Sequence, residues 1–303
     1  MNMVKKTTLA VLAFCCMTAA QATILRVNNV SGMAPYASIQ DAVDAAQDGD
    51  TIMVDGSTVR YDGATIDKQL VVVGPGYLLN KNGLSAELAD AVINNWLNLE
   101  KEGIALIGLH INDRVNVKAP KVVITRCQIS YDNLEFERDA NNSIIHQNYF
   151  SNAGIHFNQS QNHQVTNNIF QSMQVRDPHN SYVAYNTCYG TGGSFESVPG
   201  SANRVERNIV HREGWDDEPD NTYSDNLLVD FDFFGGTDTD KDVFERTMEL
   251  PDNAGNVYGA FAGTDPYVLS GIPAGPVIEE LTVPASVEEG SKLNVTIKLG
   301  LQK

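Results

Sequence analysis

The sequence is poor in basic residues, in cysteine and in tryptophan. It carries 21 Lys and Arg against 38 Asp and Glu, which gives a formal net charge of −17 at pH 7. Nucleic acids bind proteins through positive surface, and this chain has little of it. The composition therefore argues against a nucleic-acid partner. It also argues against unaided binding of a polyanion, unless cations gather locally.

Cysteine is too scarce for a disulfide framework. Of four in the chain, two lie near the N-terminus, which leaves Cys127 and Cys188. These two fall about three coils apart in the repeat described below, too far for a disulfide. We expect both to be small buried core residues. After the N-terminal segment, no apolar run is long enough to span a membrane.

The first 22 residues have the pattern of a signal peptide. Two lysines precede the apolar run TLAVLAFCCMTAA, and the tripeptide that ends at Ala22 fits the A-x-A cleavage rule. The run is also too short for a spanning helix. We therefore expect a secreted, periplasmic or cell-surface protein. A lipoprotein is the alternative, but Phe14 is bulky for the position before a lipidated Cys15.

One pattern dominates the chain between Ser143 and Leu228. Five segments, SIIHQNYF, HQVTNNIF, SYVAYNTC, NRVERNIV and TYSDNLL, each place an Asn between apolar residues. The positions, at steps of 20, 18, 22 and 18 residues, are Asn148, Asn168, Asn186, Asn208 and Asn226. Extended backwards, the pattern puts Cys127, Gly108 and Gly74 in the same slot. A period near 20 predicts a solenoid, because one coil cannot bury its own apolar face.

The recurrent Asn distinguishes among solenoids. Asn tolerates the left-handed backbone of a tight turn, and stacked turns bring successive amides to about 4.8 Å, where they form a ladder. On these residues the chain, from Thr23 to Leu228, resembles the pectin-lyase-like superfamily of right-handed parallel β-helices. The resemblance implies an all-β solenoid of about nine to ten coils, each of about 20 residues. It implies no single activity, since one fold hosts many functions.

The segments outside the regular coils predict covers and insertions. Ser38 to Ala46 reads as a short amphipathic helix, similar to the helix that covers the first coil in such domains. Tyr77 to Asp90 is predicted to be an inserted loop, with a helix over Ser85 to Leu97 as the rival. We assign residues 23–270 to the β-helix domain. Residues 271–303 form a linker and a C-terminal β-hairpin, which either covers the last coil or serves as an interaction tail.

A second short strand follows most ladder positions: RVNVK, NLEFE, GIHFN, SMQVR, GGSFE and GWDDE. Alternate side chains of a strand face opposite ways. The apolar alternates expected in the core are Val115, Val117, Leu134, Phe136, Ile155, Phe157, Met173, Val175 and Phe195. One outward column is then Asn116, Glu135, His156, Gln174, Ser194 and Asp216. The next column is Lys118, Glu137, Asn158, Arg176, Glu196 and Glu218.

This outer face is where we expect chemistry. Stacking brings Glu135 and His156 to about 5 Å, close enough for the carboxylate to orient the ring. A polysaccharide lyase needs a base near the C5 proton of a uronate and a cation beside its carboxylate. His156 or Arg176 is the predicted base. Predicted substrate-binding residues on the same face are Asn116, Lys118, Glu137, Asn158, Gln174, Glu196 and Asp216.

Two other functions fit the same face. A glycoside hydrolase needs two carboxylates about 5–9 Å apart, for which Glu135 with Glu137, or Glu196 with Asp216, are candidates. A non-catalytic structural or adhesion-type solenoid would leave the face merely solvated. Family motifs do not decide: chondroitinase-B-like and alginate lyases carry a Lys and an Arg on this face, where this chain has Glu137 and Asn158. We therefore expect a protein that interacts with an acidic polysaccharide, with catalysis left open.

Calcium is the one cofactor that the sequence suggests. Asp238, Asp240, Asp242 and Glu249 match positions 1, 3, 5 and 12 of a calcium-binding loop. Val243 stands where such a loop needs Gly for its sharp turn. A short surface helix over DKDVFERTMEL is therefore the alternative interpretation.

Overall fold

The computed structural model describes residues 22–303 except for 85–88, 172–174, 191–199, 213–216, 218, 231, 283–291, 293–294 and 303. The expected signal peptide lies outside this part, apart from Ala22. Seven residues of the predicted outer columns and core also lie outside it: Met173, Gln174, Ser194, Phe195, Glu196, Asp216 and Glu218.

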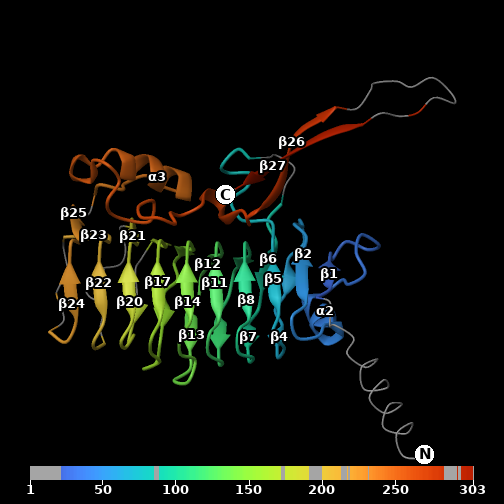
Figure 1. Ribbon diagram of the computed structural model, residues 1–303, viewed down its shortest axis with the longest axis horizontal. Helices are drawn as coiled ribbons and strands as arrows, with labels where there is room; N and C mark the ends of the chain where they lie inside the picture. The colour runs from blue at the N-terminus through green and yellow to red at the C-terminus, as the bar shows by residue number, and fades with distance from the viewer. Residues whose placement is uncertain are drawn as a thin grey trace, which may run out of the picture.

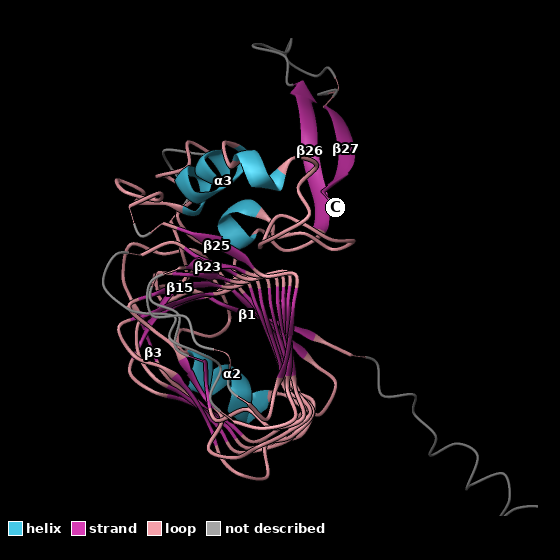
Figure 2. Cartoon of the chain, turned by 90° about the vertical axis from the view of Figure 1, so that its left-hand side faces the viewer, coloured by secondary structure: helices cyan, strands magenta, loops and turns pink. Residues whose placement is uncertain are grey.

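Short parallel strands stack into a β-solenoid of about eight turns, slightly fewer than the coils predicted (Figures 1 and 2). Sheet A runs in the order β1 (Ile24–Val27), β2 (Thr51–Val54), β5 (Val71–Val73), β8 (Ala105–Ile107), β11 (Val123–Thr125), β14 (Ile144–His146), β17 (Gln164–Thr166), β20 (Tyr182–Ala184), β22 (Arg204–Glu206) and β24 (Thr222–Ser224). All its pairings are parallel, as the period predicted.

Two further sheets complete each coil. Sheet B contains β3 (Tyr61–Asp62), β6 (Val92–Asn94), β9 (His110–Ile111), β12 (Gln128–Ser130), β15 (Tyr149–Ser151), β18 (Ile169–Phe170), β21 (Thr187–Cys188), β23 (Ile209–His211) and β25 (Leu227–Val229). Sheet C contains β4 (Thr65–Ile66), β7 (Leu97–Leu99), β10 (Val115–Val117), β13 (Leu134–Phe136), β16 (Ile155–His156) and β19 (Val175–Arg176). From β2 to β21 the chain passes repeatedly from A to B to C, and in the described residues no strand of sheet C follows β19.

The core lies between the three sheets and is built from columns of like side chains. Phe150 stacks on Phe170 of the next coil at 4.4 Å between ring centroids, and Phe136 lies 4.8 Å from Phe157. The predicted core residues of β10, β13 and β16, together with Val175, are all buried. The alternation read from the sequence is therefore confirmed for the described residues. Cys127 and Cys188 are buried core residues and form no disulfide with each other.

The predicted Asn ladder is present. Asn168 Nδ2 donates to Asn186 Oδ1 at 3.0 Å and to the carbonyl of Ile145 at 2.9 Å, so each amide bonds to both neighbouring coils. The same bonds recur along the row, which consists of Asn148, Asn168, Asn186, Asn208 and Asn226. The first four side chains are fully buried. At the other end of the row, the backbone N–H of Cys127 donates to Asn148 Oδ1.

The left-handed residue of each turn precedes the ladder position, which corrects the predicted register. Positive φ angles of 53–56° occur at Arg126, Gln147, Asn167, Tyr185, Arg207 and Asp225. Because Ile107 pairs with Thr125, Gly108 aligns with Arg126 and not with Cys127. Gly108, at φ 64°, thus takes the left-handed position for which glycine is suited, and Leu109 takes the ladder slot. Gly74 aligns with Gly108 and is also one position early.

The segments before and within the first coils match the sequence in part. Helix α2 (Ile39–Ala45) begins at the N-cap Ser38 and buries Ile39, Ala42 and Val43, near β1 and β2. The rival helix over Ser85 to Leu97 is wrong, because β6 and the start of β7 occupy its second half. The described part of Tyr77 to Asp90 contains turns and no helix or strand.

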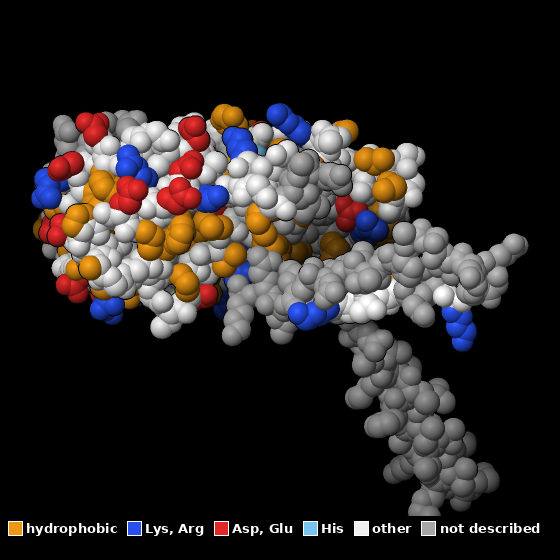
Figure 3. All heavy atoms as spheres, turned by 90° about the horizontal axis from the view of Figure 1, so that it is seen from above, with side chains coloured by type: hydrophobic (Ala, Val, Ile, Leu, Met, Phe, Trp, Pro, Cys, Tyr) orange, Lys and Arg blue, Asp and Glu red, His pale blue; other side chains and the backbone are white. Residues whose placement is uncertain are grey.

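The segment after Leu228 turns back along the solenoid, which the sequence did not predict. Residues 232–272, called the strap here, contain α3 (Asp240–Met248), η1 (Pro251–Asn253) and η2 (Leu269–Gly271). The strap lies over sheet B (Figure 1) and buries Phe234, Phe261 and Tyr267 against Tyr149 and Ile169. Seen from above, apolar side chains of this layer form a band beside charged ones (Figure 3).

The left-handed turn residues hold the strap in place. Their side chains point outward, opposite to the ladder. Asn167 Nδ2 donates to the carbonyls of Ala260 and Ala262, and Gln147 Nε2 donates to Pro266 O at 2.7 Å. Arg126 Nη1 likewise donates to Ile272 O at 3.0 Å. In each coil of this region, one turn therefore supplies both an inward side chain at the ladder position and an outward side chain that bonds to the strap.

Asp240 connects helix α3 to the C-terminal part of the strap. Its buried carboxylate accepts bonds from the Ser270 N–H at 2.6 Å, from Tyr267 Oη at 3.1 Å and from Asn82 Nδ2 at 2.6 Å. The hydrogen bonds favour the charged form and lower the pKa of Asp240, but burial has the larger effect and raises the pKa. The inserted loop, which carries Asn82, is thereby tied to α3 and η2.

The C-terminal hairpin is present, but it does not cover the last coil. β26 (Gly275–Thr282) pairs antiparallel with β27 (Thr296–Gln302). Figures 1 and 2 show the hairpin projecting from the body above the early coils, away from β24 and β25. The tail alternative describes this position better than the cover that we expected.

Replacing Asn168 by Ala tests the ladder. The substitution leaves buried bonding partners on Asn148 and Asn186 unsatisfied, so we expect a loss of about 1–3 kcal/mol in the free energy of unfolding, measured by urea denaturation. Gln164→Ala is the matched control, because this exposed amide lies on the same coil. Equal stability of the two variants would contradict the energetic role of the ladder.

His163 makes the stability depend on pH. Its ring packs against both Phe157 and Phe136. Nδ1 accepts from the Ser143 N–H, and Nε2 bonds with Ser160 Oγ at 2.9 Å. Burial lowers the pKa of His163 to about 3. Between the unfolded value of 6.5 and this value, only the unfolded chain binds the proton. Stability is therefore complete above pH 6.5 and falls as the pH drops below it.

We expect this residue to contribute a slope of roughly 1.4 kcal/mol per pH unit below about pH 6. Urea denaturation of the wild type and His163→Gln between pH 7 and pH 5 measures the slope. The variant should be less stable at pH 7, because it loses the ring packing, and should depend less on pH. An unchanged slope would show that His163 does not titrate in this way.

Candidate functional site

The outer face of sheet C brings the predicted polar column together. Strand pairing aligns Asn98, Asn116, Glu135, His156 and Arg176 across consecutive coils. Asn116 Nδ2 donates to Asn98 Oδ1 at 2.9 Å. The column thus starts with an outward-facing pair of Asn side chains and continues with ionisable side chains. We call these five residues the sheet C column.

The carboxylate and the imidazole of this column form the expected pair. Glu135 Oε1 lies 2.9 Å from His156 Nδ1, and each side chain is 22% exposed. The carboxylate accepts from Nδ1, which leaves Nε2 as the second ring nitrogen. Nε2 is shielded from solvent and has no hydrogen-bond partner among the described residues. Glu135 therefore fixes both the tautomer and the orientation of the ring.

Arg176 lies closer to this pair than the sequence indicated. It aligns with His156 itself, whereas we predicted it one column further out, in line with Asn158. Val175, not Met173, pairs with Ile155, so the strand is displaced by two residues. A two-residue displacement keeps each side chain on the same face, which is why alternation alone could not detect it. The guanidinium is exposed and has no ion pair among the described residues.

The outer column is less suited to an acidic ligand. Lys118 Nζ bonds to Glu100 Oε1 at 2.9 Å, which neutralises the cation. Glu137 is exposed, and Asn158 donates to the carbonyl of Phe136 from a left-handed backbone, at φ 44°. Of the remaining predicted binding residues, Gln174, Glu196 and Asp216 lie outside the described residues.

Two exposed aromatic side chains border the face and were missed from the sequence. Trp96 is 59% exposed and Tyr131 is 74% exposed. Both lie in turns that connect sheet B to sheet C, Trp96 after β6 and Tyr131 after β12. The signal was available, since Tyr131 directly follows β12 and Trp96 lies in the two-residue turn between β6 and β7. Amphipathic rings at the surface are frequent at binding sites.

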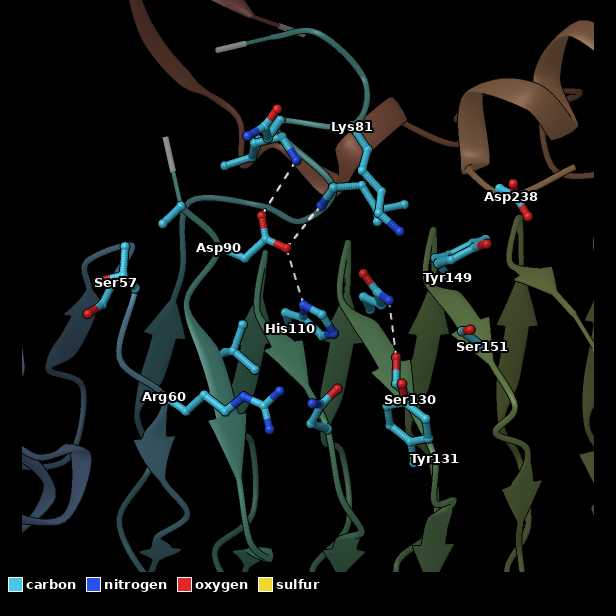
Figure 4. Close-up of a pocket in the computed structure, with 18 residues that line it drawn as sticks. Ser57, Arg60, Lys81, Asp90, His110, Ser130, Tyr131, Tyr149, Ser151 and Asp238 are labelled. Carbon is cyan, nitrogen blue, oxygen red and sulfur yellow. Dashed lines mark hydrogen bonds and ion pairs between the residues drawn. The ribbon is translucent and has the colours of Figure 1, made fainter. Parts of the chain in front are cut away.

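A second group of polar residues surrounds a cavity over sheet B (Figure 4). The cavity has a volume of about 560 Å³ and lies between the outer face of β3 to β15 and the inserted loop. Asp90 Oδ2 lies 3.2 Å from His110 Nδ1 in its wall, and Lys81 and Arg60 reach it from opposite sides. No sequence argument named these residues, because the site exists only where the loop folds over the sheet.

The predicted calcium loop is not formed. Helix α3 occupies the segment from Asp240 to Met248, as the alternative proposed. Asp242 caps it by accepting from the Thr239 N–H at 2.9 Å, while Asp240 turns inward to the strap. Glu249 pairs with Arg246, and Asp238 is exposed. Within the described residues, no group of three or more His, Cys, Asp or Glu side chains could hold a metal ion.

The chain was compared with family models, with curated proteins and with solved structures. No family model, no curated protein and no solved structure matches this chain. The parallel β-solenoid itself is shown, and no assignment to the pectin-lyase-like superfamily is. In the part of the chain that is described, no helix is long and apolar enough to cross a membrane.

Calcium should not stabilise the protein through this segment. We expect the same melting temperature in calcium and in chelator, measured by circular dichroism. Asp242→Ala should lower the stability by about 0.5–2 kcal/mol through the lost helix cap, while Glu245→Ala on the same helix should change it little. A calcium-dependent rise in melting temperature that Asp242→Ala removes would restore the loop assignment.

Proposed function

We propose that this protein is exported and binds an acidic polysaccharide along the sheet C column. The observation that carries the proposal is the alignment of Glu135, His156 and Arg176 on three consecutive coils. Coils repeat at about 4.8 Å, so the three groups extend over roughly 10 Å, the length of two or three sugar units. An extended chain can lie across them without bending.

The chemistry of the column suits a uronate. Arg176 offers an exposed cation for the sugar carboxylate, and a charge-assisted hydrogen bond is about twice as strong as a neutral one. Asn116 offers amide groups for hydroxyls. The neighbouring Trp96 and Tyr131 offer rings for the apolar face of a sugar. The cation compensates locally for the negative charge of the chain as a whole.

Lyase chemistry is the reaction that the same groups would support. Neutral His156, held by Glu135, would take the C5 proton of a uronate on Nε2, while Arg176 stabilises the charge that develops on the carboxylate. Elimination would then form a C4–C5 double bond and break the C4–O4 bond, and the leaving oxygen would take a proton from the imidazolium of His156 or from water. Because Nε2 is shielded from solvent, turnover also requires the substrate to gain access to it. Binding is therefore the primary proposal, and cleavage is its extension.

A structural or adhesion role is the second candidate. It is favoured by the projecting hairpin of β26 and β27, in which Ile297 is 53% exposed. A glycoside hydrolase has less support. Glu135 is already engaged with His156, and Glu196 and Asp216 lie outside the described residues.

Binding to a panel of uronate-containing polysaccharides, with dextran as the neutral control, tests the proposal. Affinity electrophoresis should detect retardation by at least one uronate polymer. Arg176→Gln should weaken that binding about tenfold, which corresponds to about 1.4 kcal/mol. Lys241→Gln removes the same charge from the strap and should leave the affinity unchanged. The absorbance of an unsaturated product, with and without calcium, reports cleavage.

If cleavage occurs, His156→Ala should abolish it while binding persists. The fold of each variant is checked by its melting temperature. Absence of binding to every uronate polymer, or equal binding by Arg176→Gln and the wild type, would exclude the sheet C column as the site.

A further inference from the structure

We infer that the cavity over sheet B is a separate binding site for a carboxylated sugar, either a single uronate or the acidic end of an oligosaccharide. It lies on a different sheet from the column described above. The inference therefore does not depend on the proposed function. Its volume of about 560 Å³ falls within the range of small-molecule pockets, roughly 300–1,000 Å³.

Two cations and two carboxylates line the cavity. Arg60 and Lys81 are both exposed, and neither forms an ion pair within the described part of the chain. Figure 4 shows them reaching the cavity from opposite sides, Lys81 from the inserted loop and Arg60 from the sheet. By contrast, Lys118 and Lys121 are matched by Glu100 and Glu102. The lining also holds the carboxylates of Asp90 and Asp238. Arg60 and Lys81 therefore offer two positions for a ligand carboxylate, and the two acidic side chains offer acceptors for its hydroxyl groups.

Hydrogen-bond acceptors in the wall require a ligand that also donates. The carboxylate of Asp90 is fixed by the backbone N–H of Leu78 at 3.1 Å and lies 3.2 Å from His110 Nδ1. The ring is thereby held by Asp90. Hydroxyl groups of a ligand would donate to the carboxylate oxygens of Asp90 and Asp238, which line the cavity.

An aromatic ring completes the set. Tyr131 is 74% exposed at the rim, and its ring offers a flat apolar surface. The ligand must then combine a negative charge, several hydroxyl donors and an apolar ring face. A uronic acid has all three. Inorganic phosphate lacks the apolar face, a neutral hexose lacks the charge, and a fatty acid lacks the hydroxyls.

Calorimetric titration of the full-length mature protein with glucuronate tests the inference. We expect saturable binding that depends on Arg60 and Lys81. Glucose should bind at least tenfold more weakly, and inorganic phosphate should not compete. Arg60→Gln and Lys81→Gln should each weaken glucuronate binding about fivefold or more. Both side chains are exposed, so the variants should fold normally, which unchanged melting curves would verify. Lys121→Gln serves as the matched control.

Arg176→Gln separates this site from the sheet C column. In this variant, the glucuronate binding that depends on Arg60 and Lys81 should persist, whatever happens to polysaccharide binding. Loss of glucuronate binding in Arg176→Gln, with no effect of Arg60→Gln or Lys81→Gln, would place the sugar on sheet C and overturn the inference. No binding of glucuronate, or equal affinity for glucose, would also overturn it. If the protein bound glucuronate as expected but bound no polysaccharide, the inference about the cavity would still hold.

Discussion

The structure depends on the hydrogen bonding of each coil to the next. Parallel pairing satisfies the backbone of every strand, but the turns between sheets A and B would bury unpaired groups without a further partner. The ladder amides provide it: Asn168, for example, bonds to the backbone of one neighbouring coil and to the amide of the other. Because these bonds are directional, they hold successive coils in register. The alignment of the aromatic columns, of the sheet C column and of the cavity wall depends on that register.

The same turns organise the surface. A left-handed residue precedes each ladder position, so its side chain points away from the core while the Asn points into it. Gln147 and Asn167 use this geometry to bond to the strap. The strap in turn anchors the inserted loop through Asp240 and Asn82. The loop then forms one side of the cavity. The left-handed turn residues thus position the strap, the strap positions the inserted loop, and the loop forms the candidate binding site on the outside of the solenoid.

The repetitive part of the fold could be predicted because its signals are local. Alternation marks the core residues of β10 and β13, and the spacing of Asn marks the coils. Arg176 could not be placed, since a displacement by two residues leaves alternation unchanged. The strap could not be predicted either. Phe261 and Tyr267 have no period of their own, and their burial depends on a surface formed some 100 residues earlier in the chain. The cavity depends on the same long-range contact.

A solenoid without such a strap behaves nearly as a one-dimensional system, in which each coil is stabilised only by its neighbours and the ends can fray separately. Here Tyr267 contacts Tyr77, 190 residues away, and Ile272 accepts a bond from Arg126. These contacts connect the end of the chain to its first coils. Loss of the last coils would therefore release the strap from the early ones as well. We expect cooperative unfolding of coils that the strap spans, and slow folding, because such distant contacts close large loops.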